Sequence, residues 1–186
     1  EAEFGEYDMG IPKYVFSASK SVTALAIGML IDEGRLSADE KLIDIFAQKL
    51  NPISKLKLRD ITVETLLTMK SCVVFNELGS MTVTNWQETF INSSIRGNIN
   101  KDFNYNSLNT YMLAAIIKKK TGKTVCEYLA PRLFEPLDIQ NYYWEKSPEG
   151  IEKGGWGLYI RPEDFAKIAI MVQDGGVWHD KRLISS

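Results

Sequence analysis

Residues 16–36 read FSASKSVTALAIGMLIDEGRL, and the interpretation of the whole chain starts from this stretch. Its apolar side chains recur at helical spacing, at Val22, Leu25, Ala26, Met29 and Leu30. Gly34 follows them, and glycine commonly ends a helix because it adopts the left-handed conformation without strain. The stretch therefore predicts a helix over residues 17–34 that begins at a serine.

Further helices are predicted along the chain, with few strands between them. Apolar spacing and capping residues predict helices over residues 43–50, 63–69, 86–91, 110–120, 124–133 and 162–173. Ser107 or Asn109 is expected to cap the long helix near the middle of the chain. Residues 52–60 are expected to form a loop, residues 137–144 a loop with a short strand, and residues 154–160 a glycine-hinged strand.

The composition limits the classes of protein that this chain can belong to. It has 186 residues, of which 45% are hydrophobic and 25% charged, as in an ordinary globular domain. The 22 basic and 24 acidic residues give a net charge of −2, so a nucleic-acid partner is not expected. No apolar run reaches the roughly 18 residues that a membrane-spanning helix needs, so no membrane span is predicted.

Histidine and cysteine are too scarce for several common kinds of site. The only histidine is His179, so a Ser-His-Asp triad would have to use it. The two cysteines, Cys72 and Cys126, form no CxxC pair and are expected to be buried or half-buried thiols. A zinc site with several imidazoles is excluded. We therefore expect chemistry that avoids histidine and needs no metal and no cofactor.

The pattern Ser-x-x-Lys occurs twice, and its surroundings distinguish the two copies. Ser54 and Lys57 lie in the expected loop, whereas Ser17 and Lys20 lie at the start of the predicted helix. Residues three apart share a helix face, so Lys20 is expected to reach the Ser17 hydroxyl. A lysine held in apolar surroundings loses its proton more readily and can act as the base for a serine nucleophile. The alternative is a purely structural role, in which the serine caps the helix and the lysine is exposed to solvent.

A second candidate segment, FNYNSLN at residues 103–109, precedes the long central helix. Tyr105 could relay protons if it lies near a lysine, and Ser107 points the same way in an extended loop. The alternative is that Tyr105 has no catalytic role and is an exposed aromatic ring beside helix-capping residues.

Taken together, these segments resemble the penicillin-recognising serine hydrolase superfamily. Its nearest members are class C β-lactamases, D-alanyl-D-alanine carboxypeptidases and β-lactamase-like esterases. The resemblance is carried, in the order typical of the family, by FSASKS (16–21), AIG (26–28), DEGRL (32–36), TLLTM (65–69), FNYNS (103–107), GGWGL (154–158) and EDFAK (163–167).

The resemblance implies a single α/β (α+β) domain over residues 1–186 with a β-lactamase-like fold. It implies a serine hydrolase that acts on an amide or ester carbonyl of a small-molecule or peptide substrate. Ser17 would be acylated, Lys20 and Tyr105 would shuttle protons, and Ser107 and Asn76 would contact the substrate. The alternatives are a non-catalytic or covalent penicillin-sensing domain, or an inactive fragment of such an enzyme.

The chain departs from the family pattern in its third motif. Residues 120–122 spell Lys-Thr-Gly but directly end a predicted helix, where lysine and glycine are expected as capping residues. We therefore expect a domain that is incomplete at both ends, consists mostly of its helical part, and lacks one oxyanion-hole strand. Little turnover is expected from such a chain. A dimer or a further chain segment would cover the apolar helix faces.

Cys72 is a second departure, because relatives usually carry glycine at this place. If the backbone there needs a positive φ, the cysteine costs about 1 kcal/mol.

Overall fold

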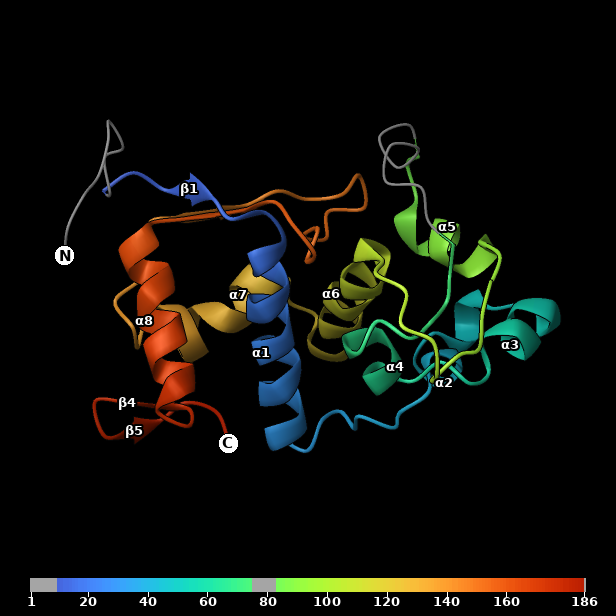
Figure 1. The fold of residues 1–186 in the computed structure, drawn as a ribbon, viewed down its shortest axis with the longest axis horizontal. Helices are drawn as coiled ribbons and strands as arrows, with labels where there is room; N and C mark the ends of the chain where they lie inside the picture. The colour runs from blue at the N-terminus through green and yellow to red at the C-terminus, as the bar shows by residue number, and fades with distance from the viewer. Residues whose placement is uncertain (1–9, 75–82, 186) are drawn as a thin grey trace.

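The computed structural model describes residues 10–74 and 83–185 and contains eight α-helices and five short strands within those ranges. The helices are α1 (Ser19–Asp32), α2 (Leu42–Ile45), α3 (Pro52–Leu58), α4 (Val63–Leu67), α5 (Trp86–Asn92), α6 (Ser107–Thr121), α7 (Val125–Leu129) and α8 (Pro162–Gln173). The strands are β1 (Lys13–Tyr14), β2 (Tyr142–Trp144), β3 (Leu158–Ile160), β4 (Val177–Trp178) and β5 (Lys181–Arg182). In Figure 1, α6 lies between α1, α7 and α8 on one side and α2 to α5 on the other.

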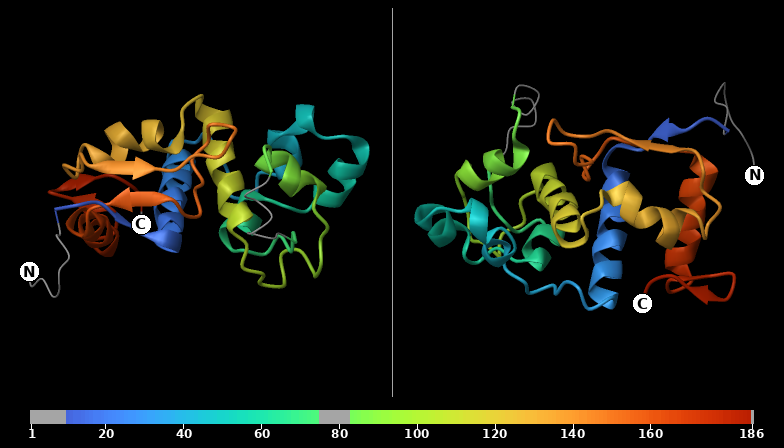
Figure 2. Two further views of the ribbon diagram at one scale, coloured as in Figure 1. Left: turned by 90° about the horizontal axis from the view of Figure 1, so that it is seen from above. Right: turned by 180° about the vertical axis from the view of Figure 1, so that it is seen from behind.

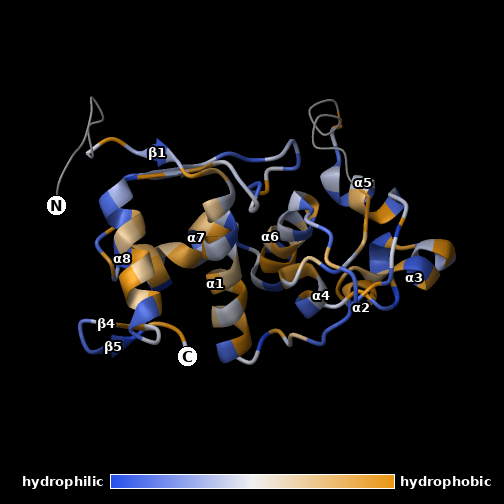
Figure 3. Cartoon of the chain, viewed as in Figure 1, coloured by the Kyte–Doolittle hydropathy of each residue, from blue (hydrophilic) through white to orange (hydrophobic). Residues whose placement is uncertain are grey.

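Helix α1 is buried in the centre of the molecule. Its predicted apolar residues pack inside the chain, and Val22, Ala26 and Leu30 are each 0% exposed. The helix contacts α6 and α7, and hydrophobic residues run along α1 and α6 in Figure 3. These three residues of α1 are thus buried within this chain.

The start of α1 differs slightly from the prediction. Residues Phe16–Ala18 form a 3₁₀ turn, and the α-helix begins at Ser19. The Ser19 hydroxyl donates to the carbonyl oxygen of Phe16 at 2.6 Å, which ties the turn to the first residue of the helix. Ser17 therefore lies in the turn that precedes α1.

A small antiparallel sheet lies against the helices on one half of the molecule (Figure 2). Its strand order is β1-β3-β2, with Tyr14 and Tyr143 both paired with Tyr159. The alternate residues Leu158 and Ile160 are buried against the helical core. Strands β4 and β5 form a separate hairpin near the C-terminal end of α8. The prediction of a mostly helical β-lactamase-like chain with few strands is confirmed.

The segment over residues 52–60 was predicted as a loop, and that prediction is wrong. Helix α3 begins at Pro52, and the Asn51 side chain accepts a hydrogen bond from the backbone N–H of Ser54. Asparagine before the helix and proline in its first turn are typical start signals. Its apolar residues Ile53 and Leu56 are exposed and Ser54 is buried, so the helix has no apolar face at helical spacing that the sequence could show.

Both ends of α6 are explained by capping. Asn106 caps its first turn by accepting from the N–H of Leu108, so neither Ser107 nor Asn109 is the cap. Gly122 ends the helix with φ of 73°, after a last turn that carries three lysines. The prediction that Lys-Thr-Gly at residues 120–122 is a helix end is confirmed.

No helix of the described residues is long and apolar enough to cross a bilayer.

Candidate active site

Ser17 is exposed at the turn that leads from the sheet into α1. The preceding residue, Phe16, has a φ of 46°, which is unusual for a residue with a side chain. The N–H of Val15 donates to the carbonyl oxygen of Leu158 at 3.0 Å, so β3 fixes the chain just before the turn. These contacts hold the Ser17 hydroxyl at the surface.

Lys20 is half-buried, and its Nζ lies at hydrogen-bond distance from three oxygens. Its Nζ lies 3.2 Å from Ser17 Oγ, 3.3 Å from Ser107 Oγ and 2.7 Å from the carbonyl oxygen of Gly155. The predicted reach from Lys20 to Ser17 is therefore present. These three acceptors fix the position of the amine next to the serine.

Tyr105 completes the group from the other side. Its hydroxyl donates to Ser17 Oγ at 2.8 Å, and its ring lies 4.8 Å from Lys20 Nζ. The loop that carries it is held by the N–H of Asn104, which donates to the carbonyl oxygen of Met69 at 2.8 Å. Asn106 Nδ2 donates to the carbonyl oxygen of Val73 at 2.7 Å. The expected approach of Tyr105 to Ser17 is confirmed.

Two glycines let the chain before β3 approach this group. A Cβ on Gly155 would lie 3.0 Å from the carbonyl oxygen of Ser107 and 3.5 Å from Lys20 Nζ. Gly154 has a φ of 68°, and its carbonyl oxygen accepts from the Thr23 hydroxyl at 2.9 Å. Gly155 was not predicted as a site residue, although the two adjacent glycines before Trp156 are a usable sequence signal.

A cleft of about 650 Å³ opens in front of Ser17. This volume falls within the roughly 300–1,000 Å³ that is usual for small-molecule sites. The residues that line it are Tyr14, Phe16, Ser17, Val83, Trp86, Tyr105, Ser107, Lys146, Pro148, Lys153 and Trp156. Apart from Tyr105, the aromatic residues and the two lysines were not predicted as site residues, because they come from separate segments that only the tertiary structure brings together.

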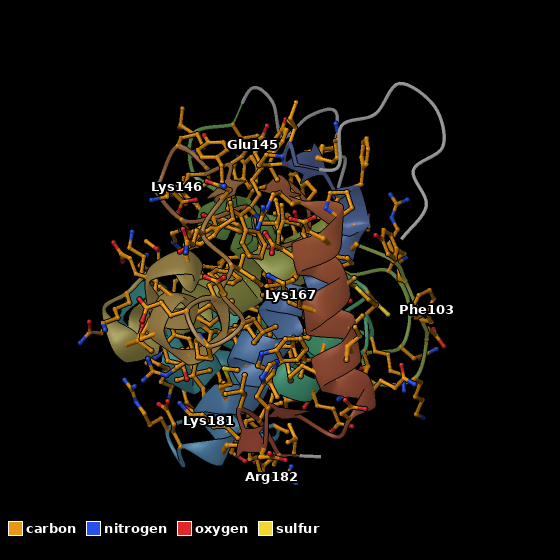
Figure 4. All side chains as sticks on the ribbon, turned by 90° about the vertical axis from the view of Figure 1, so that its left-hand side faces the viewer. Phe103, Glu145, Lys146, Lys167, Lys181 and Arg182 are labelled. Atoms are coloured by element: carbon orange, nitrogen blue, oxygen red, sulfur yellow. The ribbon has the colours of Figure 1, made fainter. Side chains whose placement is uncertain are left out.

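The charge in this cleft is partly neutralised within the protein. Lys153 Nζ lies 2.6 Å from Glu145 Oε2, and Lys146 Nζ lies 3.9 Å from the buried carboxylate of Glu152. Figure 4 shows Glu145 and Lys146 at one end of the molecule, with Lys181 and Arg182 at the opposite end. Two lysines thus line a cleft with aromatic walls.

The second Ser-x-x-Lys copy does not form a comparable group. Ser54 is 5% exposed, and Lys57 Nζ donates instead to the carbonyl oxygens of Ile91 and Ser93. Burial lowers the pKa of Lys57, but this amine lies between backbone carbonyls. Only in the Ser17 copy does the lysine donate to the serine of its own motif.

Three other residues singled out from the sequence lie elsewhere or outside the described ranges. Cys72 has a φ of 54°, as expected for a place where relatives carry glycine, and burial together with Asp102 raises its pKa. His179 lies in the turn between β4 and β5, at the end of α8 away from the sheet. Asn76 lies outside the described residues.

Comparison with known proteins gives a family match over most of the chain. The family model described as Beta-lactamase matches residues 13–183. No curated protein sequence matches the chain.

Several solved structures share the fold at low sequence identity. A Bacillus anthracis protein described as a 6-aminohexanoate-dimer hydrolase has a TM-score of 0.86 at 19% identity, covering 99% of this chain and 53% of its own. The D-amino acid amidase of Ochrobactrum anthropi SV3 has a TM-score of 0.74 at 18% identity, covering 97% and 58%. An octameric penicillin-binding protein homologue of Pyrococcus abyssi has a TM-score of 0.73 at 24% identity, covering 94% and 46%. This chain therefore spans about half the length of these three structures.

Proposed function

Because this chain belongs to the beta-lactamase family, we propose that it is a serine hydrolase that attacks an amide or ester carbonyl. The observation that carries the proposal is the position of Ser17 Oγ. It accepts hydrogen bonds from both Lys20 and Tyr105 and faces a cleft of about 650 Å³. A hydroxyl between two proton-transfer groups, open to a substrate-sized cleft, suits nucleophilic catalysis.

The proposed reaction has two steps. In the first, Ser17 Oγ forms a bond to the carbonyl carbon while its proton moves to Lys20 Nζ in its neutral amine form, or to the oxygen of Tyr105 in its deprotonated form; whichever group takes the proton must have lost its own proton beforehand. The bond from the carbonyl carbon to the leaving nitrogen or oxygen then breaks, and the proton passes to that leaving atom. In the second step, water attacks the acyl-enzyme, the bond to Ser17 breaks, and the serine regains its proton.

Lys20 and Ser107 support this assignment through their contacts. The Gly155 carbonyl and the Ser107 hydroxyl hold Lys20 Nζ within 3.3 Å of both serine oxygens. Ser107 also lines the cleft, so we assign it a substrate contact as well as a role in orienting the amine. Asn76 is assigned a further substrate contact on the family resemblance alone.

The substrate class is proposed from the family and its structural neighbours. Their names include a D-amino acid amidase and penicillin-binding proteins, which supports an amide or ester carbonyl as the reacting group.

Covalent labelling tests the proposed nucleophile. The chain is incubated with a fluorophosphonate or a penicillin, its intact mass is measured, and the adduct is mapped to a peptide. We expect one adduct, on Ser17, which is lost in Ser17→Ala and retained in the matched control Ser54→Ala. An adduct on Ser54 or Ser19 would contradict the assignment.

The stability of the adduct separates a hydrolase from a covalent sensor. We expect the penicillin or ester adduct to decay with release of the acyl group once excess reagent is removed. An adduct that persists would favour the alternative of a penicillin-sensing domain.

A further inference from the structure

One carboxylate outside the Ser17 group joins three walls of the cleft. Glu149, in the loop after β2, accepts from the backbone N–H of Trp86 at 2.7 Å and from the Tyr111 hydroxyl at 2.5 Å. Its other oxygen accepts from Gln87 Nε2 at 2.9 Å. A single side chain thus connects the first turn of α5, the middle of α6 and the loop that carries Pro148.

The hydrogen bonds to Glu149 are stronger than ordinary ones because their acceptor is a carboxylate. Hydrogen bonds to an ionised carboxylate are shorter and about twice as strong as those between neutral groups. Tyr111 is buried, and burial together with Glu149 raises its pKa, so it remains a hydrogen-bond donor. Loss of the Glu149 carboxylate would leave this buried hydroxyl with Ser147 as its remaining partner and would release the start of α5.

The group that Glu149 positions is a pair of stacked rings in the cleft. The rings of Trp86 and Trp156 lie 5.4 Å apart with 19° between their planes, and Trp86 meets Tyr111 edge-on at 5.1 Å. Glu149 holds the backbone of Trp86, while Trp144 Nε1 donates to the carbonyl oxygen of Trp156 at 2.8 Å. A hydrogen bond therefore holds the backbone of each tryptophan, and both residues line the cleft that contains Ser17.

Trp86 is only 5% exposed, so the half-buried Trp156 offers the accessible ring and Trp86 supports it. We propose that Trp156, stacked on Trp86, determines substrate specificity by binding a flat apolar group of the substrate, and that Glu149 is the positioning residue of this pair. The inference rests on the proposed function for the reaction that follows binding. Large rigid rings bury apolar surface with little loss of side-chain freedom, and they favour a second aromatic ring over an aliphatic group of similar size.

Binding without chemistry tests the ring pair. The Ser17→Ala chain is titrated with phenylacetamide, cyclohexylacetamide and acetamide, and the indole N–H signals of its four tryptophans are followed by NMR. We expect phenylacetamide to bind about tenfold more tightly than acetamide and more tightly than the cyclohexyl compound. Adding Trp156→Ala should remove this preference. Equal binding of the three amides, or a preference that survives Trp156→Ala, would overturn the proposal.

The positioning role of Glu149 has its own measurement. With the active chain and a phenylacetyl ester, Glu149→Ala should raise KM by about threefold to tenfold and change kcat by less. This pattern corresponds to the loss of ground-state binding. Glu149→Gln keeps one acceptor oxygen and should recover part of the loss. Glu88→Ala removes an exposed carboxylate from α5, the helix that begins at Trp86, and should leave KM unchanged. A fall in kcat with no change in KM would contradict the positioning role.

The outcomes separate this inference from the proposed hydrolase. An amide preference in the Ser17→Ala chain, combined with no adduct on Ser17 in the parent chain, would refute the hydrolase alone. An adduct on Ser17 without any aromatic preference would refute the ring pair alone. If Glu149→Ala fails to fold, Glu149→Gln and Trp156→Ala still decide the two parts of the proposal.

Discussion

The hydroxyl of Tyr105 lies 2.8 Å from Ser17 Oγ, although 88 positions separate the two residues in the chain. Lys20 lies against both, since its Nζ donates to Ser17 and stands 4.8 Å from the ring of Tyr105. Ser17 Oγ therefore has two proton-transfer partners at hydrogen-bond distance, and either can take the serine proton when it is in its deprotonated form. The contributions of these two partners can be separated by mutation.

Replacement of Lys20 should abolish acylation of Ser17. Base catalysis contributes about 10²–10⁴ in rate, and the only histidine lies in the β4–β5 turn. We expect Lys20→Ala to reduce the rate of fluorophosphonate labelling by at least about 10². Lys57→Ala is the matched control and should label normally. Labelling of Lys20→Ala at more than roughly a tenth of the parent rate would refute the base role.

Tyr105→Phe removes one hydroxyl and keeps the ring beside Lys20. If the tyrosine oxygen relays the proton, acylation should slow by about 10²-fold while binding of an amide in the cleft stays the same. The measurement is a comparison of labelling rate with amide affinity in the same variant. A labelling rate within twofold of the parent rate would assign Tyr105 to the cleft wall alone.

Gly155→Ala should disturb the group through contact rather than backbone strain. The added Cβ would lie 3.0 Å from the carbonyl oxygen of Ser107 and 3.5 Å from Lys20 Nζ, so one of them must shift. We expect slower labelling together with a lower free energy of unfolding. Gly34→Ala is the control, because Gly34 has a φ of 66° and no atom near the added Cβ. It should lose about 1 kcal/mol of stability and leave labelling unchanged.

Cys72 occupies a backbone conformation that favours glycine, with a φ of 54°. Cys72→Ala and Cys72→Gly both remove the thiol, and only the second removes the strain of a side chain. Cys72→Gly should therefore be more stable than Cys72→Ala by about 1 kcal/mol in denaturant unfolding. Greater stability of the alanine variant would indicate that this loop adopts another conformation in solution.

Asp164 should make stability depend on pH in the acid range. Burial alone would raise the pKa of this carboxyl, but hydrogen bonds from Arg161 and Lys167 outweigh burial and lower the pKa below 3.8. A lowered pKa in the folded state stabilises the fold above the unfolded pKa, and this contribution is lost as the pH falls through the folded pKa. The Tm difference between the parent chain and Asp164→Asn should therefore be largest near about pH 7 and shrink below about pH 4. A Tm difference that does not change with pH would contradict the assignment.

The local parts of the fold and site could be predicted from the sequence, whereas the long-range parts could not. Helical spacing alone predicts α1 and the reach of Lys20 to Ser17, since both depend on residues within one turn. The approach of Tyr105 to Ser17 was expected only through family resemblance, because no local pattern encodes a contact between distant residues. The segment beginning at Pro52 was misread because its apolar residues do not share one buried face: Ile53 and Leu56 are exposed, whereas Ser54 is buried.

The aromatic residues that line the cleft could not be predicted from the sequence, because their arrangement also depends on contacts between distant segments. Trp86 and Trp156 belong to separate segments, and each alone resembles an ordinary core residue. Their stacking depends on Glu149, whose hydrogen bonds join a loop to two helices. A carboxylate in a surface loop has no sequence signal for such a role.

The hydrogen bond from Lys20 to the Gly155 carbonyl determines when the active group can form during synthesis. The two residues are 135 positions apart, so the ribosome makes the serine and its lysine long before the carbonyl that holds the amine. Contacts between distant residues also slow folding, because a large loop must close before they form. A nascent chain that ends before Gly155 therefore carries the serine without a fully held base, and complete assembly of the group has to wait for the segment leading into β3.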